Sequence, residues 1–107
     1  MRTSKYQPKN SVYRFGAKQA KFIEYLNSKY PEYSVYRTIG YVQSNFVSNI
    51  LRANTDALYI YDIDDVRILK HIFVLVRNDE RDIKLHKVYS SAVNRYINFL
   101  SVQSIAK

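Results

Sequence analysis

The chain has 107 residues, of which 47% are apolar, and it carries a formal net charge of +8. This length fits one domain with a buried core, and the apolar content excludes a disordered composition. Without cysteine the chain has no disulfide or thiolate metal site, and with only two glycines a fold rich in tight hairpins is disfavoured.

The first segment, residues 1–14, is predicted to be a basic arm preceding one helical domain over residues 15–107. The following cations all precede the first acidic residue, Glu24: Arg2, Lys5, Lys9, Arg14, Lys18 and Lys21. A basic arm on a body of mixed charge is typical of proteins that bind nucleic acid. The basic start is not followed by an apolar signal core, so we expect a cytoplasmic protein with no membrane partner.

Two helices are predicted in the first half of the domain. Apolar residues at helical spacing predict the first helix over residues 15–29, and Pro31 ends it. The second helix is expected to begin at Ser34, a good N-cap, and to continue to Ala53. Gly40 lies inside this second helix and weakens it by about 1 kcal/mol relative to alanine.

Two further helices are predicted after a connection over residues 54–61, which could contain a short extended piece. Asp62 is expected to cap the third helix, residues 63–76, where Asp64 and Asp65 also suit the positive end of the helix dipole. This local role explains the acidic cluster without a metal, because calcium loops need a longer set of ligands.

The apolar residues 72–76 could also form a buried strand, but the helical spacing of the whole segment favours a helix. Residues 77–86 are predicted to be a polar connection and residues 87–102 the last helix. The fold predicted from these elements is all-α, a compact bundle of about four helices.

No catalytic constellation is recognisable in the sequence. His71 and His86 are not paired with a nucleophile in any known spacing, and no glycine-rich loop could hold a nucleotide phosphate. We therefore expect a protein that is not an enzyme and that uses no cofactor and no metal.

The helix faces opposite the predicted core carry cations with short polar groups and no acid. On the second helix these residues are Arg37, Tyr41, Ser44, Ser48 and Arg52, and on the last helix they are Lys87, Ser90, Ser91, Asn94, Arg95 and Asn98. Lysine and arginine bind phosphates, and serine and asparagine can bond to phosphates or base edges. The chain also has eleven tyrosines. They could stack on bases or could simply cover the edge of a small core.

Three segments resemble the core-binding, SAM-like domain of tyrosine recombinases and phage integrases. Ser34-Val35-Tyr36-Arg37-Thr38 with Tyr41 resembles its S-x-x-T-x-x-x-Y helix, although Tyr41 follows Thr38 by three positions instead of four. Tyr61-Asp62-Ile63-Asp64-Asp65 resembles the start of its third helix. The segment from Ser90 to Leu100 is similar to its closing helix, an ending that also occurs in accessory modules of restriction endonucleases.

This resemblance covers roughly residues 15–102 and implies contact with duplex DNA through the second and fourth helices. By position it points to Arg37, Thr38, Ser90, Asn94 and Arg95. The recombinase catalytic domain, with its arginine, histidine and tyrosine constellation, is not found in this sequence. The chain is thus either a stand-alone binding protein or a piece of a longer one.

The sequence predicts a non-catalytic DNA-binding accessory protein of a bacterium, phage or mobile element. The candidate DNA-binding residues are Arg14, Lys18, Arg37, Thr38, Tyr41, Arg52, Lys87, Ser90, Asn94 and Arg95. One alternative is a protein-interaction module, such as a phage-encoded inhibitor or a small virion or assembly component. Another is a protein that binds single-stranded nucleic acid or RNA.

Overall fold

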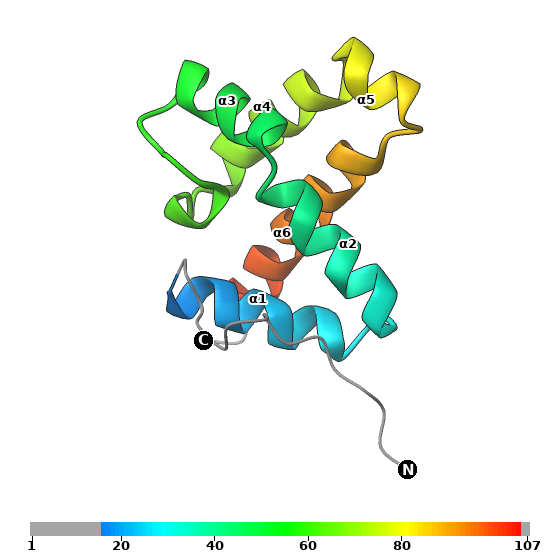
Figure 1. The fold of residues 1–107 in the computed structure, drawn as a ribbon. Helices are drawn as coiled ribbons and strands as arrows, with labels where there is room; N and C mark the ends of the chain where they lie inside the picture. Colours follow the sequence, from blue (N-terminus) through cyan, green and yellow to red (C-terminus); the bar gives the residue numbers. More distant parts are fainter. Residues whose placement is uncertain (1–15, 106–107) are drawn as a thin grey trace.

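A computed structural model of the chain describes residues 16–105, which form an all-α globule without a β-strand (Figure 1). The basic arm predicted over residues 1–14, including Arg14, lies outside these residues. The elements in chain order are α1 (Ala17–Asn27), α2 (Glu32–Val42), α3 (Asn45–Asn54), the 3₁₀ turn η1 (Ile60–Asp62), α4 (Val66–Arg77), α5 (Glu80–Lys84) and α6 (Val88–Ile105).

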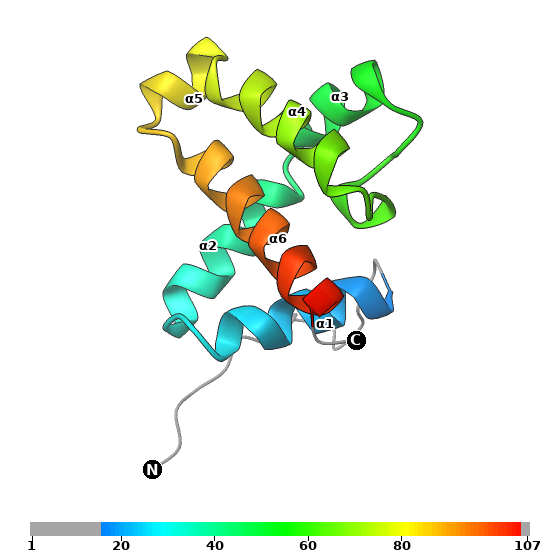
Figure 2. The ribbon, with the colours of Figure 1, turned by 180° about the vertical axis from the view of Figure 1, so that it is seen from behind.

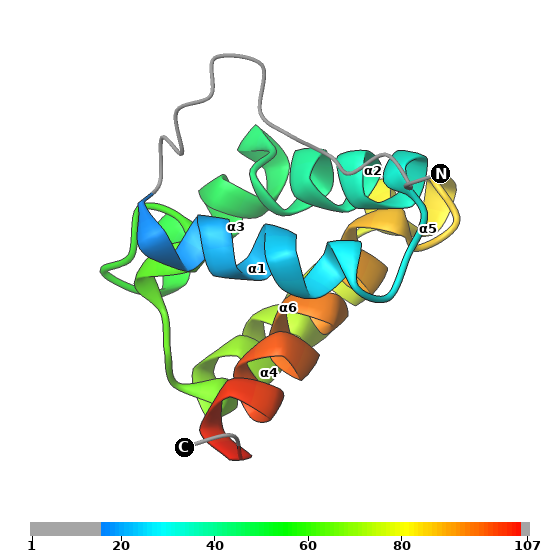
Figure 3. The ribbon, with the colours of Figure 1, turned by 90° about the horizontal axis from the view of Figure 1, so that it is seen from below.

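The helix α6 crosses the middle of the molecule (Figure 2) and packs against α1, α2, α4 and α5. Its first turns lie next to α5, and α1 lies against its later turns (Figure 3). A helix with neighbours on several sides has apolar residues around much of its circumference. This explains why Ala92, Val93, Tyr96, Ile97, Phe99 and Leu100 are all buried.

An aromatic cluster joins α1 and η1 to α6. Phe22 of α1 lies 5.1 Å from the Tyr96 ring and 5.3 Å from the Phe99 ring, measured between ring centroids. Tyr61 of η1 makes an edge-to-face contact with Tyr96 at 5.7 Å. Such tilted and edge-to-face pairs are favourable beyond the area they bury. Burial of Tyr96 raises the pKa of its phenol, and the nearby carboxylates of Asp64 and Asp62 raise it further.

The start of α6 is fixed by a buried carboxylate from α5. Asp82 is fully buried. Its Oδ1 accepts hydrogen bonds from the backbone N–H groups of Tyr89 (2.8 Å) and Ser90 (3.1 Å), and its carbonyl oxygen accepts one from the Lys87 N–H (2.7 Å). The Tyr89 and Ser90 donors belong to the first turn of α6, the Lys87 donor directly precedes it, and none of them has an acceptor within the helix. Asp82 therefore replaces the N-cap that α6 lacks in its own sequence.

The polar connection predicted over residues 77–86 contains a short helix, α5, that the prediction did not include. Asp79 caps the short helix α5 by accepting a hydrogen bond from the Arg81 N–H at 2.9 Å. An aspartate N-cap satisfies one of the free N–H groups at a helix start, which lets even a five-residue helix form next to α6.

The single helix predicted from Ser34 to Ala53 is also wrong, because the chain breaks it at Ser44. The Ser44 hydroxyl donates to the carbonyl oxygen of Tyr41 (2.7 Å) and accepts from the Val47 N–H (3.3 Å), so that it ends α2 and caps α3. Gln43 anchors the break, because its amide oxygen accepts hydrogen bonds from Gln19 and Tyr61, both at 2.7 Å. The break allows α3 to pack on α4.

The start of α2 also differs from the prediction, which placed it at Ser34. Pro31 occupies the N-cap position of α2, and Ser34 lies one turn inside the helix. Proline suits this end of a helix because its missing N–H would have no intrahelical acceptor there. The Ser34 side chain is thus available for a tertiary contact rather than a cap.

The acidic cluster before α4 has three separate local roles. Asp65, rather than the predicted Asp62, caps α4 by accepting from the Arg67 N–H at 2.9 Å. Hydrogen bonds from the Arg67 side chain and backbone lower the pKa of Asp65. Asp62 accepts from the N–H groups of Leu58 and Tyr59, both at 3.2 Å, and closes the connection before η1. Asp64 forms an ion pair with Lys18 of α1.

The stability of the fold should depend on the buried carboxylate of Asp82. We expect Asp82→Ala to lower the free energy of unfolding by about 2 kcal/mol, because two backbone donors lose their acceptor. Urea unfolding followed by circular dichroism measures the change. Glu80→Ala is the control, since among the described residues Glu80 makes only an exposed pair with Lys84 at 3.6 Å, and its loss should have no measurable effect. Equal effects of the two variants would contradict this role of Asp82.

Substitution by alanine should change the free energy of unfolding in opposite directions at the two glycines. A Cβ at Gly40 would meet no atom of the other described elements within 4 Å. Gly40→Ala should therefore raise the free energy of unfolding by about 0.5–1 kcal/mol through helix propensity. Gly16 has a φ of +86°, where a side chain is strained, so Gly16→Ala should lower stability by about 1 kcal/mol. Thermal unfolding of both variants tests whether stability rises in Gly40→Ala and falls in Gly16→Ala.

Candidate nucleic-acid interface

The helices α2 and α6 lie side by side and leave a groove of about 180 Å³ between them. The groove is lined by Ser34, Arg37, Thr38, Tyr41, His86, Val88, Ser91, Ala92 and Arg95. None of these lining residues carries a carboxylate. Four of the candidate DNA-binding residues, Arg37, Thr38, Tyr41 and Arg95, thus come together in one place.

The guanidinium of Arg95 is held in a fixed position by neutral partners. Its Nη1 donates to the Ser34 hydroxyl and to the Thr38 hydroxyl, both at 2.9 Å. The guanidinium carbon also lies 3.8 Å from the centre of the Tyr30 ring, a close cation–π contact. Among residues 16–105, no carboxylate forms an ion pair with Arg95. The groove therefore contains an oriented, half-buried cation whose charge is not neutralised by the described protein groups.

Thr38 takes part by orienting Arg95 rather than by facing outward. Its side chain is buried, and its hydroxyl donates to the Ser34 carbonyl oxygen at 2.9 Å while accepting from Arg95. With both directions of the hydroxyl occupied, Thr38 has little capacity for another hydrogen bond. We assign it as a positioning residue.

Arg37 supplies a second cation beside Arg95. It lies on the exposed side of α2 and makes no ion pair or hydrogen bond with the other residues that the structure describes. One phosphate or two successive phosphates in the groove could contact both guanidinium groups, each of which offers a planar set of donors.

The end of the groove next to the start of α6 is formed by a strained segment. His86 has a φ of 62° and Lys87 a φ of 68°, and non-glycine residues rarely adopt this left-handed conformation. The Lys87 ammonium donates to the Arg77 carbonyl oxygen at 2.9 Å, which helps to hold the turn. The strain places the His86 side chain at the groove.

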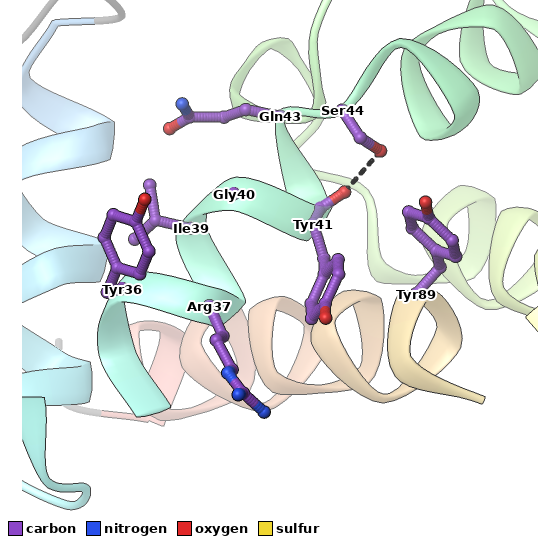
Figure 4. A pocket seen from close by; sticks show the side chains of 8 residues that line it. All are labelled: Tyr36, Arg37, Ile39, Gly40, Tyr41, Gln43, Ser44 and Tyr89. Atoms are coloured by element: carbon purple, nitrogen blue, oxygen red, sulfur yellow. Dashed lines mark hydrogen bonds between the residues drawn. The ribbon is translucent and has the colours of Figure 1, made fainter. Parts of the chain in front are cut away.

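A second, larger hollow of about 430 Å³ adjoins the groove on the outer side of α2 (Figure 4). Its lining residues are Tyr36, Arg37, Ile39, Gly40, Tyr41, Gln43, Ser44 and Tyr89. Figure 4 shows Arg37 and Tyr41 extending in the same direction from α2 and Tyr89 standing opposite Tyr41. The Tyr41 and Tyr89 rings meet edge to face at 5.2 Å. Arg37 and Tyr41 line both the hollow and the groove, so the two spaces share a wall.

The other candidate residues that the structure describes do not line the groove. Lys18 pairs with Asp64, and Arg52 donates to the Leu58 carbonyl oxygen while lying 5.2 Å from the Tyr59 ring. Ser90 is buried beside Asp82. The ammonium of Lys87 is bound to Arg77, as described above. Asn94 is exposed on α6 but is not part of the lining.

Ser48 was expected on the polar face of the second helix, and the structure instead buries it. Its hydroxyl has no hydrogen-bond partner among the described residues. The expectation was wrong because it assumed one continuous helix. The break at Ser44 turns α3 so that a different face is exposed.

Several residues of the site are not recognisable from the sequence. The sequence predicts Ser34 as an N-cap and indicates no binding face that includes Tyr30, His86 or Tyr89. The i, i+4 spacing of Ser34 with Thr38 and of Ser91 with Arg95 could have indicated facing pairs on two helices. No comparable signal exists for Tyr30, because the fold alone brings its ring to Arg95.

Comparisons with protein-family models, with curated proteins and with solved structures found no match to this chain. None of the helices that the structure describes is long and apolar enough to span a membrane. The described residues also contain no cluster of three histidine, aspartate or glutamate side chains that could hold a metal ion. The geometry and charge of the groove are therefore the basis for assigning a function.

The strain at the groove gives a stability prediction. His86→Gly should raise the free energy of unfolding by about 0.5–1 kcal/mol, because glycine adopts a positive φ without a steric penalty. Lys87→Gly should raise it less, since that change also removes the hydrogen bond to Arg77. Chemical denaturation of both variants tests this order, and a destabilised His86→Gly variant would show that the side chain contributes more than its strain costs.

Proposed function

We propose that the protein is a non-catalytic DNA-binding accessory protein that contacts the backbone of duplex DNA through the groove between α2 and α6. The observation that carries this proposal is the Arg95 guanidinium, which Tyr30, Ser34 and Thr38 orient and which has no carboxylate partner among residues 16–105. A cation fixed in this way is ready to bind an anion, because its orientation is set before the ligand arrives.

The other lining residues favour a phosphate over other anions. Arg37 adds an exposed second guanidinium, and Tyr41 and Ser91 add hydroxyl groups that donate hydrogen bonds. Most protein contacts to DNA are of this kind, and they fix the position of the protein without reading the sequence. The net charge of +8 supports the same class of partner, since it attracts a polyanion over a distance.

The resemblance to the core-binding domain of integrases supports the proposal from a different direction. It implies DNA contact through the helices that contain Arg37, Thr38, Ser90, Asn94 and Arg95. Arg37 and Arg95 line the groove, and Thr38 orients Arg95. We extend the proposal to a SAM-like arrangement in which the basic arm, with Arg14, follows the DNA backbone.

A protein-interaction module is the second candidate, such as a phage-encoded inhibitor or a virion component. It is favoured by Tyr33 and Tyr36 on α2, which are 68% and 64% exposed close to Arg37. Exposed tyrosine and arginine are enriched at the centres of protein interfaces. Co-purification with one defined protein, without any shift of DNA, would support this function instead.

Duplex DNA binding should depend on the two groove arginines. We expect Arg95→Ala to weaken binding about tenfold, because a charge-assisted hydrogen bond to phosphate is lost. Arg37→Ala should reduce the slope of log K against log salt by about 1, which corresponds to one phosphate contact. Fluorescence anisotropy with a labelled duplex over a series of salt concentrations measures both effects.

Lys70→Ala is the matched control, because it removes one exposed positive charge from α4, outside the groove. Thermal unfolding curves establish that each variant is folded. The proposal would be rejected if the wild-type protein did not bind duplex DNA at low salt. It would also be rejected if Lys70→Ala weakened binding as much as Arg37→Ala and Arg95→Ala.

A further inference from the structure

We propose that the hollow over Gly40 binds an unpaired nucleobase, so that the preferred ligand is duplex DNA with a single-stranded flank. This inference rests on the proposed function, because it assumes that the neighbouring groove holds the phosphate backbone. It adds a second subsite, and with it a preference between forms of DNA that the groove alone does not provide.

The size and lining of the hollow suit a planar aromatic ligand. Its volume of about 430 Å³ lies within the range of pockets that bind small molecules. Three tyrosines, Tyr36, Tyr41 and Tyr89, contribute aromatic surface, and Ile39 contributes apolar surface. Bases stack on such side chains irrespective of their identity, since every base has a π-face.

The polar groups at the rim are mostly engaged with the protein. The Gln43 amide oxygen accepts from Gln19 and Tyr61, and the Ser44 hydroxyl donates to the Tyr41 carbonyl oxygen. Figure 4 shows the Gln43 side chain directed away from Tyr41 and Tyr89. These groups are therefore poorly placed to read the edge of a base. We infer that the subsite accepts any of the four bases.

Gly40 is the residue that leaves the space open. It lies inside α2, where glycine costs about 1 kcal/mol relative to alanine. A Cβ at this position would meet no atom of another described element within 4 Å, so no close approach of another described helix requires a glycine. A larger side chain would project into the hollow that Tyr36 and Tyr41 border. Replacing Gly40 by a residue with a large side chain would therefore fill the hollow.

The shared wall connects the base subsite to the phosphate groove. Arg37 and Tyr41 line both spaces, so a backbone that contacts Arg37 in the groove passes next to the hollow. A base in a continuous duplex is stacked and paired and cannot enter the hollow without losing those interactions. A base at a single-stranded flank is already free, and for this base stacking on the tyrosines is a net gain.

The experiment compares three labelled probes that share one duplex sequence. The first is blunt, the second has a short single-stranded overhang, and the third has the same overhang without its bases. The abasic overhang carries the same phosphates, so the affinity ratio of the second probe to the third isolates the base. We expect the wild-type protein to bind the overhang with bases about tenfold more tightly than the abasic one.

Gly40→Phe should reduce this ratio to about one, because the introduced ring occupies the hollow. Ala53→Phe is the matched control, since it adds the same ring to the exposed side of α3 and should leave the ratio unchanged. Tyr36→Leu provides a second variant at an exposed position, and it should reduce the ratio in part. Thermal unfolding curves verify that all three variants are folded.

A wild-type ratio near one, together with salt-dependent binding of the blunt duplex, would overturn the base subsite and leave the proposed function intact. A tenfold ratio that persists in Gly40→Phe would also overturn it, because the base would then bind elsewhere. Failure of all three probes to bind at low salt would instead reject the proposed function itself.

Discussion

The position of α6 depends on the carboxylate of Asp82, and the rest of the structure depends on α6. The first N–H groups of a helix need acceptors, and inside a protein, water cannot supply them. Asp82 supplies an acceptor for two of these donors from the neighbouring α5. With its start held in this way, α6 packs against α1, α2, α4 and α5 and brings Arg95 to the hydroxyl groups of α2.

The regular spacing of apolar residues was sufficient to predict the all-α class and most helix positions. The stripe of α4 illustrates this, since Leu69, Ile72 and Val76 are fully buried as the helical period requires. The end of the first helix was also predictable, because Pro31 disfavours helical backbone before it. These features depend on neighbouring residues along the chain, which the sequence displays directly.

The break between α2 and α3 and the helix α5 could not be predicted in the same way. Ser44 is one of several serines in the segment, and it caps α3 because tertiary contacts at Gln43 favour a bend there. The apolar stripe continues through the break, so periodicity alone indicates one long helix. The helix α5 is too short for a helical period to be recognised in its sequence. It lies next to the start of α6, where Asp82 accepts hydrogen bonds from the first N–H groups of that helix.

The sequence was sufficient to predict that the candidate site has a charged face. It was not sufficient to predict the groove between the two helices. Spacing and the absence of acidic residues indicated Arg37, Tyr41 and Arg95, which the fold does bring together. Arg52 lies beyond the break, on α3, and therefore left the predicted face. The roles of Tyr30 and Thr38 depend on contacts between different helices, and such contacts have no signature in the sequence.

The neutral partners of Arg95 also determine how the site responds to its surroundings. An arginine oriented by carboxylates loses part of that support when salt screens the ion pair. It also loses support when acid protonates the carboxylates. Hydroxyl groups and an aromatic ring are not ionised at neutral pH, so ionic strength and moderate acidity leave the Arg95 contacts with Ser34, Thr38 and Tyr30 unchanged. Salt would therefore release a bound polyanion while the empty groove keeps its shape, and rebinding would require no reorganisation of the protein.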